Sequence, residues 1–179
     1  MKKITLIMLL TLVAATANAQ IEKGKIQLTG NFGYTRNETG GNETNVFTIV
    51  PQAGLFLSDK TSLGVILGYQ SFGNSNARST NFNYGVFGRF YKSIADRFYF
   101  FAQPQFVLGT GETAAGVDTS SFSIGVRPGF SYFVSDKISM DLTTLGFIYD
   151  KSEEGNLERS TTSFSINPAT MSLGVSFIL

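Results

Sequence analysis

The sequence predicts an all-β protein: an eight-stranded antiparallel up-and-down transmembrane β-barrel with an N-terminal cleavable signal peptide. Three observations support this prediction. Segments of about ten residues alternate apolar with small or polar residues, their apolar faces carry almost no charge, and the connections between them alternate between short and long. Successive side chains of a strand point to opposite faces, and about ten residues of a tilted strand cross the hydrocarbon core of a bilayer.

The composition agrees with a protein that faces lipid. Only 15% of the 179 residues are charged, and the chain has 17 Phe and 7 Tyr but no Cys, His or Trp. Soluble domains have about 25% charged residues. The formal net charge is +1, and no basic cluster follows the first three residues. We therefore expect neither disulfides, nor thiolate metal sites, nor a nucleic-acid partner.

The N-terminus has the pattern of an export signal. Lys2 and Lys3 precede an apolar run over 4–13, and Ala17-Asn18-Ala19 ends the segment. This pattern predicts a signal peptide over 1–19 that is cleaved before Gln20. The apolar run is shorter than the roughly twenty residues that a spanning helix needs. The barrel domain is therefore expected over 20–179.

Eight strands are expected in chain order, each justified by apolar residues at every second position. The first four are predicted at 25–34, 45–57, 62–72 and 82–90. The other four are predicted at 97–109, 122–130, 138–149 and 163–179. An even number of strands lets the sheet close with no hydrogen-bonding edge left in lipid.

Several positions interrupt the regular pattern. In the seventh strand Leu145 and Phe147 share a face with Asp141, which indicates either a bulge or apolar side chains that plug the interior; we favour the plug. In the eighth strand the alternation slips near 167–170, which predicts a bulge. Pro51 and Pro128 lie in mid-strand. Because Pro lacks a backbone donor, we expect a bulge or a local gap in pairing at each.

The connections between the strands differ in length. Short turns are expected at 58–60, 92–96 and 135–137, and longer loops at 36–43, 73–80, 110–118 and 150–159. Outer-membrane barrels have short periplasmic turns and longer extracellular loops. The long loops hold four basic and eight acidic residues, which predicts an acidic outer rim. The basic residues are Arg36, Arg78, Lys151 and Arg159, and the acidic ones are Glu38, Glu43, Glu112, Asp118, Asp150, Glu153, Glu154 and Glu158.

The placement of charge predicts which face of the sheet is outside. A soluble exterior has about 25 to 35% charged residues. The strand bodies hold essentially Lys25, Arg89, Arg127 and Asp141, all on the small and polar face. That face suits a narrow lumen, and buried charges need partners. We therefore predict a structural lumen network, in which Asp141 pairs with Arg89 or Arg127. Its members are Arg89, Arg127, Asp141, Gln52, Gln103 and Gln105.

Aromatic residues are expected to form two girdles at the two membrane interfaces. The girdle near the long loops has Tyr34, Tyr69, Phe72, Phe82 and Tyr84. The girdle near the short turns has Phe56, Phe90, Phe98, Tyr132 and Phe177.

Three stretches carry a family resemblance: the A-x-A-Q end of the signal at 17–20, RPGFSYFVSDKISMDL at 127–142, and SFSINPATMSLGVSFIL at 163–179. On these the chain resembles small outer-membrane β-barrel proteins of the outer membrane protein X and A type, particularly the barrel domain common in Bacteroidota. The resemblance implies an integral protein of the bacterial outer membrane with a role in adhesion, surface recognition or envelope integrity. Its implied partners are outer-membrane lipid, the barrel assembly machinery and periplasmic chaperones.

The C-terminus resembles the signal that the assembly machinery reads in this family. The residues that match are Ser172, Gly174, Phe177 and the terminal Leu179. Family members more often end in Phe or Tyr.

The sequence bears on three classes of function. A small-solute channel is disfavoured because the interior of eight strands is just wide enough for side chains to fill. An enzyme acting on lipid or peptide is disfavoured because the chain has no His, the usual base near neutral pH. A carboxylate-only or cation site at Asp150, Glu153 and Glu154 is less expected than a solvated loop. We expect no cofactor, and we favour a structural or surface-interaction role through the extracellular loops, whose ligand the sequence does not identify.

Overall fold

The computed structural model describes residues 21–39, 42–74, 77–165 and 171–179. The predicted signal peptide lies outside these residues. Within the described ranges, no helix is long and apolar enough to cross a membrane. The strands there are β1 (Ile26–Thr39), β2 (Asn42–Ser58), β3 (Thr61–Gly73), β4 (Arg78–Ala95), β5 (Phe98–Glu112), β6 (Asp118–Ser135), β7 (Ile138–Thr143), β8 (Gly146–Glu154), β9 (Leu157–Ser165) and β10 (Ser172–Ile178).

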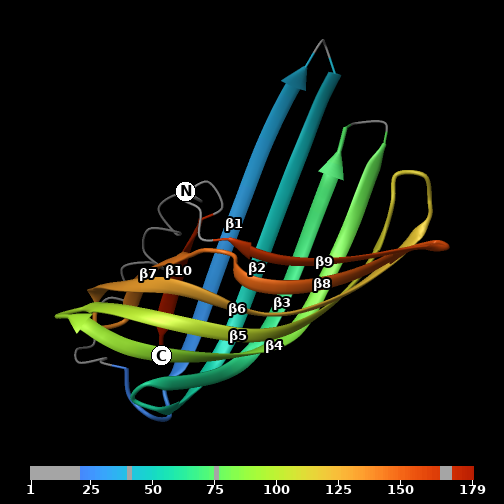
Figure 1. Cartoon of the computed structure of the whole chain (residues 1–179). Coiled ribbons are helices and arrows are strands. Elements are labelled where there is room, and N and C mark those ends of the chain that lie inside the picture. The colour runs from blue at the N-terminus through green and yellow to red at the C-terminus, as the bar shows by residue number, and fades with distance from the viewer. Residues whose placement is uncertain (1–20, 40–41, 75–76, 166–170) are drawn as a thin grey trace.

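These strands form one antiparallel sheet that closes into an eight-stranded barrel (Figure 1). Each strand from β1 to β6 pairs with the next, and β1 pairs with β10 from Gln27–Ile178 to Asn31–Gly174. The seventh position of the barrel is shared by β7 and β8, which both pair with β6. The eighth is shared by β9 and β10. The predicted eight-stranded antiparallel barrel and its eight strand positions are therefore confirmed, and the signal peptide stays a prediction.

The flanking strands continue into all four predicted long loops, so the loops are shorter than predicted. The predicted loop at 36–43 is the end of a hairpin in which β1 and β2 pair as far as Thr39–Asn42. The other three long connections are likewise the ends of β3–β4, β5–β6 and β8–β9. The polar residues that indicated loops continue the ladder because backbone pairing needs no particular side chain.

The pairing between neighbouring strands is interrupted at prolines. Ile49 and Gln52 of β2 pair with β3 in the same register, but Val50 and Pro51 between them have no partner on β3. Between β4 and β5, the pairs opposite Gln103 and Pro104 are missing in the same way. Pro supplies no N–H to the ladder, so each of these prolines opens a local gap. The prediction of a gap or bulge at Pro51 is confirmed.

A bulge lies opposite Pro128. The β6 pairs Val126–Phe147 and Gly129–Thr143 leave two residues of β6 facing three residues of the seventh strand. The extra residue shifts the alternation, so Phe147 points outward and is 51% exposed. Our preference for an apolar plug here was therefore wrong for Phe147, and the bulge is the correct alternative. Leu145 does line the interior.

The strand pairs on either side of the slip that is predicted in the eighth strand are described. Gly146 pairs with Ser165, and Thr143 pairs with Ser172. The predicted position of the bulge, 167–170, falls on residues outside the described part of the chain.

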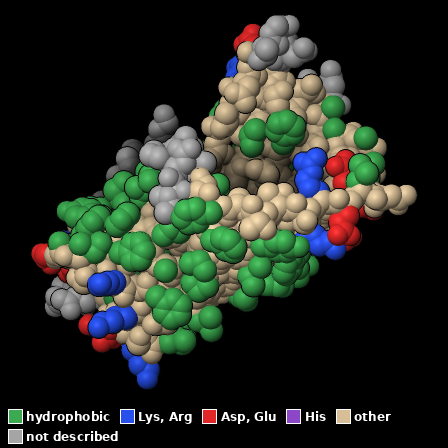
Figure 2. Space-filling model, viewed as in Figure 1, with side chains coloured by type: hydrophobic (Ala, Val, Ile, Leu, Met, Phe, Trp, Pro, Cys, Tyr) green, Lys and Arg blue, Asp and Glu red, His purple; other side chains and the backbone are tan. Residues whose placement is uncertain are grey.

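The outer wall of the barrel is apolar. Phe32, Leu67, Phe82 and Leu173 all point away from the lumen, with more than half of each side chain exposed. Hydrophobic side chains gather over the lower body of the molecule and thin out toward the hairpin tips (Figure 2). Contact between so much apolar surface and water is unfavourable, so this band is the surface that lipid covers.

We call the end of the barrel at the short turns the lower end and the end at the long hairpins the upper end. The lower end of the lumen holds a hydrophobic plug, which we define as Ile21, Phe56, Tyr91, Phe101, Phe133 and Ile178. All six are at most 6% exposed. Phe56 was expected in the girdle near the short turns, but it is 1% exposed, and its ring centroid lies 5.7 Å from that of Tyr91 with the two rings tilted. It belongs to the inward face of β2, where its neighbours Leu55 and Leu57 face outward.

Candidate functional site in the lumen

A charged network crosses the lumen directly above the plug. Arg89 of β4 and Asp141 of β7 point inward and are each 1% exposed. Arg89 Nη1 lies 2.6 Å from Asp141 Oδ2 and donates a hydrogen bond to it. Arg89 Nε donates to Gln103 Oε1 of β5 at 2.8 Å. The strand period places these side chains on the inner face, and the closure of the sheet brings β4 and β7 to opposite sides of the lumen.

The carboxylate of Asp141 is fully hydrogen bonded. Ser131 and Ser139 donate to Oδ1 at 2.8 and 3.0 Å, and Ser176 donates to Oδ2 at 2.8 Å. With Arg89, four donors surround one buried carboxylate. Such saturation offsets the cost of removing the charge from water.

Tyr91 joins this network to β1. Arg89 Nη1 donates to the Tyr91 hydroxyl at 3.2 Å, and that hydroxyl donates to Gln27 Oε1 at 3.0 Å. Gln27 Nε2 in turn donates to Ser176 Oγ at 3.2 Å. The guanidinium carbon of Arg89 also lies 4.2 Å from the centroid of the Phe101 ring, which is cation–π distance. The network and the plug are thus one continuous body of side chains.

The predicted lumen residues divide into two groups. Asp141 pairs with Arg89, and Gln103 Nε2 reaches Gln52 Oε1 at 3.4 Å and Gln105 Oε1 at 3.2 Å. Arg127 stands apart from them. None of the ion pairs within the described ranges includes Arg127, and its buried Nε has no hydrogen-bond partner.

Sequence reasoning missed several members of the network. They are Gln27, Tyr91, Ser131, Ser139 and Ser176. A signal for them was present, because each lies on the inward parity of its strand: Tyr91 is two residues beyond Arg89, and Ser139 is two residues before Asp141. Their partners are on strands that are distant in sequence.

A polar cavity of about 370 Å³ lies above the network, toward the long hairpins. Arg127, Asp150, Asn81, Asn83 and Ser123 line it, together with Gln52 and Gln105 at the side of Gln103. Figure 2 shows a hollow between the tall β1–β2 side and the β8–β9 hairpin, with basic and acidic side chains at its edge. The interior therefore changes from a packed lower half to a hollowed upper half.

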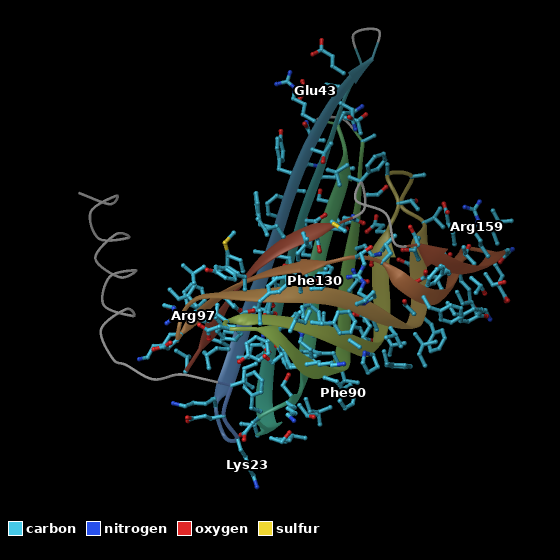
Figure 3. All side chains as sticks on the ribbon, turned by 60° about the vertical axis from the view of Figure 1, so that its left-hand side comes forward. Lys23, Glu43, Phe90, Arg97, Phe130 and Arg159 are labelled. Carbon is cyan, nitrogen blue, oxygen red and sulfur yellow. The ribbon has the colours of Figure 1, made fainter. Side chains whose placement is uncertain are left out.

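The outer hairpins carry exposed ion pairs. In β1–β2, Arg36 pairs with Glu43 at 2.8 Å, and in β8–β9 Lys151 pairs with Glu158 at 3.1 Å and Glu153 at 3.5 Å. Figure 3 shows Glu43 near the outer end of β1–β2 and Lys23 at the opposite end of the molecule. No group of three metal-ligating side chains occurs in the described part of the chain.

The residues of the predicted assembly signal lie in or beside β10. Gly174 packs against Asn31 of β1, and Leu179 exchanges backbone hydrogen bonds with Ile26 at 2.8 and 3.0 Å. Leu173, Val175 and Leu179 face outward. Recognition of this segment by assembly machinery stays a prediction.

No family model matches the sequence, and no curated protein matches it. Among solved structures, neisserial surface protein A aligns with 17% identity over 87% of this chain and 99% of that chain, with a TM-score of 0.51. The outer membrane protein Ail of Yersinia pestis aligns with 11% identity over 88% of this chain and all of that chain, with a TM-score of 0.42. The translocator domain of the autotransporter NalP from Neisseria meningitidis aligns with 10% identity, covering 98% of this chain and 95% of that domain, also with a TM-score of 0.42.

The likeness to neisserial surface protein A is one of fold. It agrees with the closed antiparallel sheet and with the apolar outer wall, which requires lipid around it. The chain is an integral β-barrel protein of the bacterial outer membrane type, and the outer membrane is its location.

Proposed function

We propose that this protein is a non-conducting outer-membrane scaffold that presents its outer hairpins as a surface for interaction. The observation that carries the proposal is the filled lower lumen, where the plug and the Arg89–Asp141 network occupy the space that a pore would need. Eight strands leave room for little more than side chains. The proposal assigns no catalytic activity, because the chain lacks the His on which most hydrolytic sites depend.

The β1–β2 and β8–β9 hairpins are the proposed contact surfaces. They project from the body of the barrel (Figure 1), and paired strands make them stiffer than loops would be. Four acidic residues and one basic residue occupy 150–158, and Leu157 is 75% exposed near the tip of β8–β9. An acidic surface with an exposed apolar side chain favours a partner that is basic and has some apolar surface.

The first test is of conduction. Proteoliposomes with the refolded protein are expected to resist swelling in iso-osmotic glucose to the same extent as empty liposomes. A porin serves as the positive control. Swelling above the empty-liposome rate would contradict the non-conducting role.

The second test is of the hairpins, with immobilised lysozyme as a basic protein probe. Residues 36–45 and 152–159 are each replaced by Asn-Gly, which suits two-residue hairpins between Thr35 and Val46 and between Lys151 and Ser160. We expect cells that carry the wild-type protein to be retained above cells that lack it, and the trimmed variant to fall to that background. The matched control trims 112–118 in β5–β6. Heat-dependent gel mobility checks that each variant folds, and equal retention of wild type and the folded trimmed variant would overturn the proposed surface.

A further inference from the structure

The lower network and the upper cavity differ in how their own polar groups are satisfied. In the lower network, Asp141 accepts four hydrogen bonds and Arg89 donates to three partners. In the upper cavity, the side chains of Asn81, Asn83 and Ser123 make no hydrogen bond within the described part of the chain, and Arg127 Nε is buried without a partner. Buried polar groups are nearly always paired, so Arg127 Nε needs a partner that the described part of the chain does not supply. Asn81, Asn83 and Ser123 are half-buried and have their hydrogen-bonding groups open to a ligand.

Polar atoms also converge at one place on the cavity wall. A Cβ atom built on Gly109 would meet Ser121 Oγ, Asn83 Oδ1 and Asn81 Oδ1. These atoms come from β4 and β6, on either side of β5. One hydroxyl and two amide oxygens thus lie close together, as polar groups do in sites that orient a polar ligand.

The cavity has one charge of each sign. Arg127 lies on β6, and Asp150 lies on β8 opposite Ser123. Both residues line the cavity, but they form no ion pair with each other in the described part of the chain. The guanidinium is a planar fork suited to a carboxylate, and the carboxylate of Asp150 suits an ammonium group. A ligand with both charges satisfies both residues, whereas a simple anion is attracted by one and repelled by the other.

We propose that the upper cavity binds a small zwitterion of amino-acid or dipeptide size, with its carboxylate on Arg127 and its ammonium group toward Asp150. The amides of Asn81 and Asn83 then hydrogen bond the part between the two charges. A volume of about 370 Å³ accommodates a molecule of this size. This inference goes beyond the proposed function and does not depend on the outer hairpins.

Glycylglycine is the probe, with acetate and methylammonium as single-charge comparators. The refolded, ¹⁵N-labelled protein has six Arg, so the Nε–Hε signal of Arg127 is assignable from the signal that Arg127→Gln removes. We expect a saturable shift of this signal with glycylglycine. We expect binding of acetate and of methylammonium to be at least about tenfold weaker, the equivalent of about 1.4 kcal/mol.

Variants separate the contributions of the two charges, and the side-chain amide signals of Asn81 and Asn83 report binding when Arg127 is absent. Arg127→Gln and Asp150→Asn are each expected to weaken glycylglycine binding at least about tenfold. The matched control is Arg78→Gln at the outer end of β4, which should bind like the wild type. Heat-dependent gel mobility shows that each variant folds.

Three results would overturn the inference. They are shifts that stay linear in glycylglycine, equal affinity for acetate, and tighter binding of glycylglycine in Asp150→Asn. The last two would indicate a plain anion site, and the first a cavity that holds water only. None of these results depends on whether cells bind the basic protein probe.

Discussion

At the residue scale, Asp141 is the most constrained side chain of the lumen. Its carboxylate is 1% exposed and is held by one guanidinium and three hydroxyls. A buried ion pair is only weak evidence for stability, since desolvation offsets much of the attraction. Removing one partner has a much larger effect, because it leaves the other charge buried without compensation.

Replacing Asp141 by Ala is therefore expected to destabilise the barrel by about 3–5 kcal/mol. The measurement is urea unfolding of the protein refolded into lipid vesicles. The control is Glu43→Ala, which removes an exposed ion pair with Arg36 and should cost no more than about 1 kcal/mol.

A double variant identifies the source of the effect. Arg89→Met with Asp141→Leu removes both buried charges, and we expect it to be more stable than Asp141→Ala alone. An unchanged unfolding midpoint in Asp141→Ala would show that the network has no structural importance.

At the scale of single elements, the seventh strand of the barrel is broken into β7 and β8 by a bulge that lies opposite Pro128. The bulge contains Gly146, which has a φ of +67°. A Cβ atom at this position would meet Val126 O and Pro128 Cδ. Only glycine therefore meets both the backbone conformation and the close approach to β6. The bulge also turns Leu145 into the cavity and Phe147 toward lipid.

Gly146→Ala is expected to cost about 2 kcal/mol or more, from the left-handed backbone and the contact with β6 together. Gly30→Ala is the matched control, because a Cβ at Gly30 has no heavy atom within 4 Å. The unfolding midpoint in urea measures both. Equal midpoints for the two variants would contradict the structural role of the bulge.

At the scale of the whole molecule, the two ends of the barrel differ. At one end β2–β3, β4–β5 and β6–β7 are joined by short turns, and the plug fills the lumen. At the other end the hairpins extend beyond the apolar band and surround the polar cavity. From this asymmetry we predict that the long hairpins lie outside the cell.

Single cysteines test the orientation, since the chain has no Cys of its own. Glu38→Cys lies near the tip of β1–β2, and Lys60→Cys lies in the turn between β2 and β3. We expect a membrane-impermeant maleimide to label Glu38→Cys on intact cells and to label Lys60→Cys only after the outer membrane is permeabilised. The reverse pattern would contradict the orientation.

The sequence by itself determined the fold class, the eight strand positions and the direction in which most side chains point. These depend on a local rule: the period of two along a strand, combined with the demand of lipid for an apolar outer face. The rule also predicted the gap at Pro51, because the missing N–H belongs to that residue alone.

Only the tertiary structure decided which arginine pairs with Asp141 and where the lumen is packed or hollow. Arg89 and Arg127 have the same inward parity, so the pattern does not distinguish them. Which arginine pairs with Asp141 depends on how β4, β6 and β7 are staggered along the barrel axis after the sheet closes. The bulge at Gly146 also moves the inward–outward alternation of the seventh strand by one residue. The stagger between distant strands is a property of the closed barrel, and no single segment of the sequence encodes it.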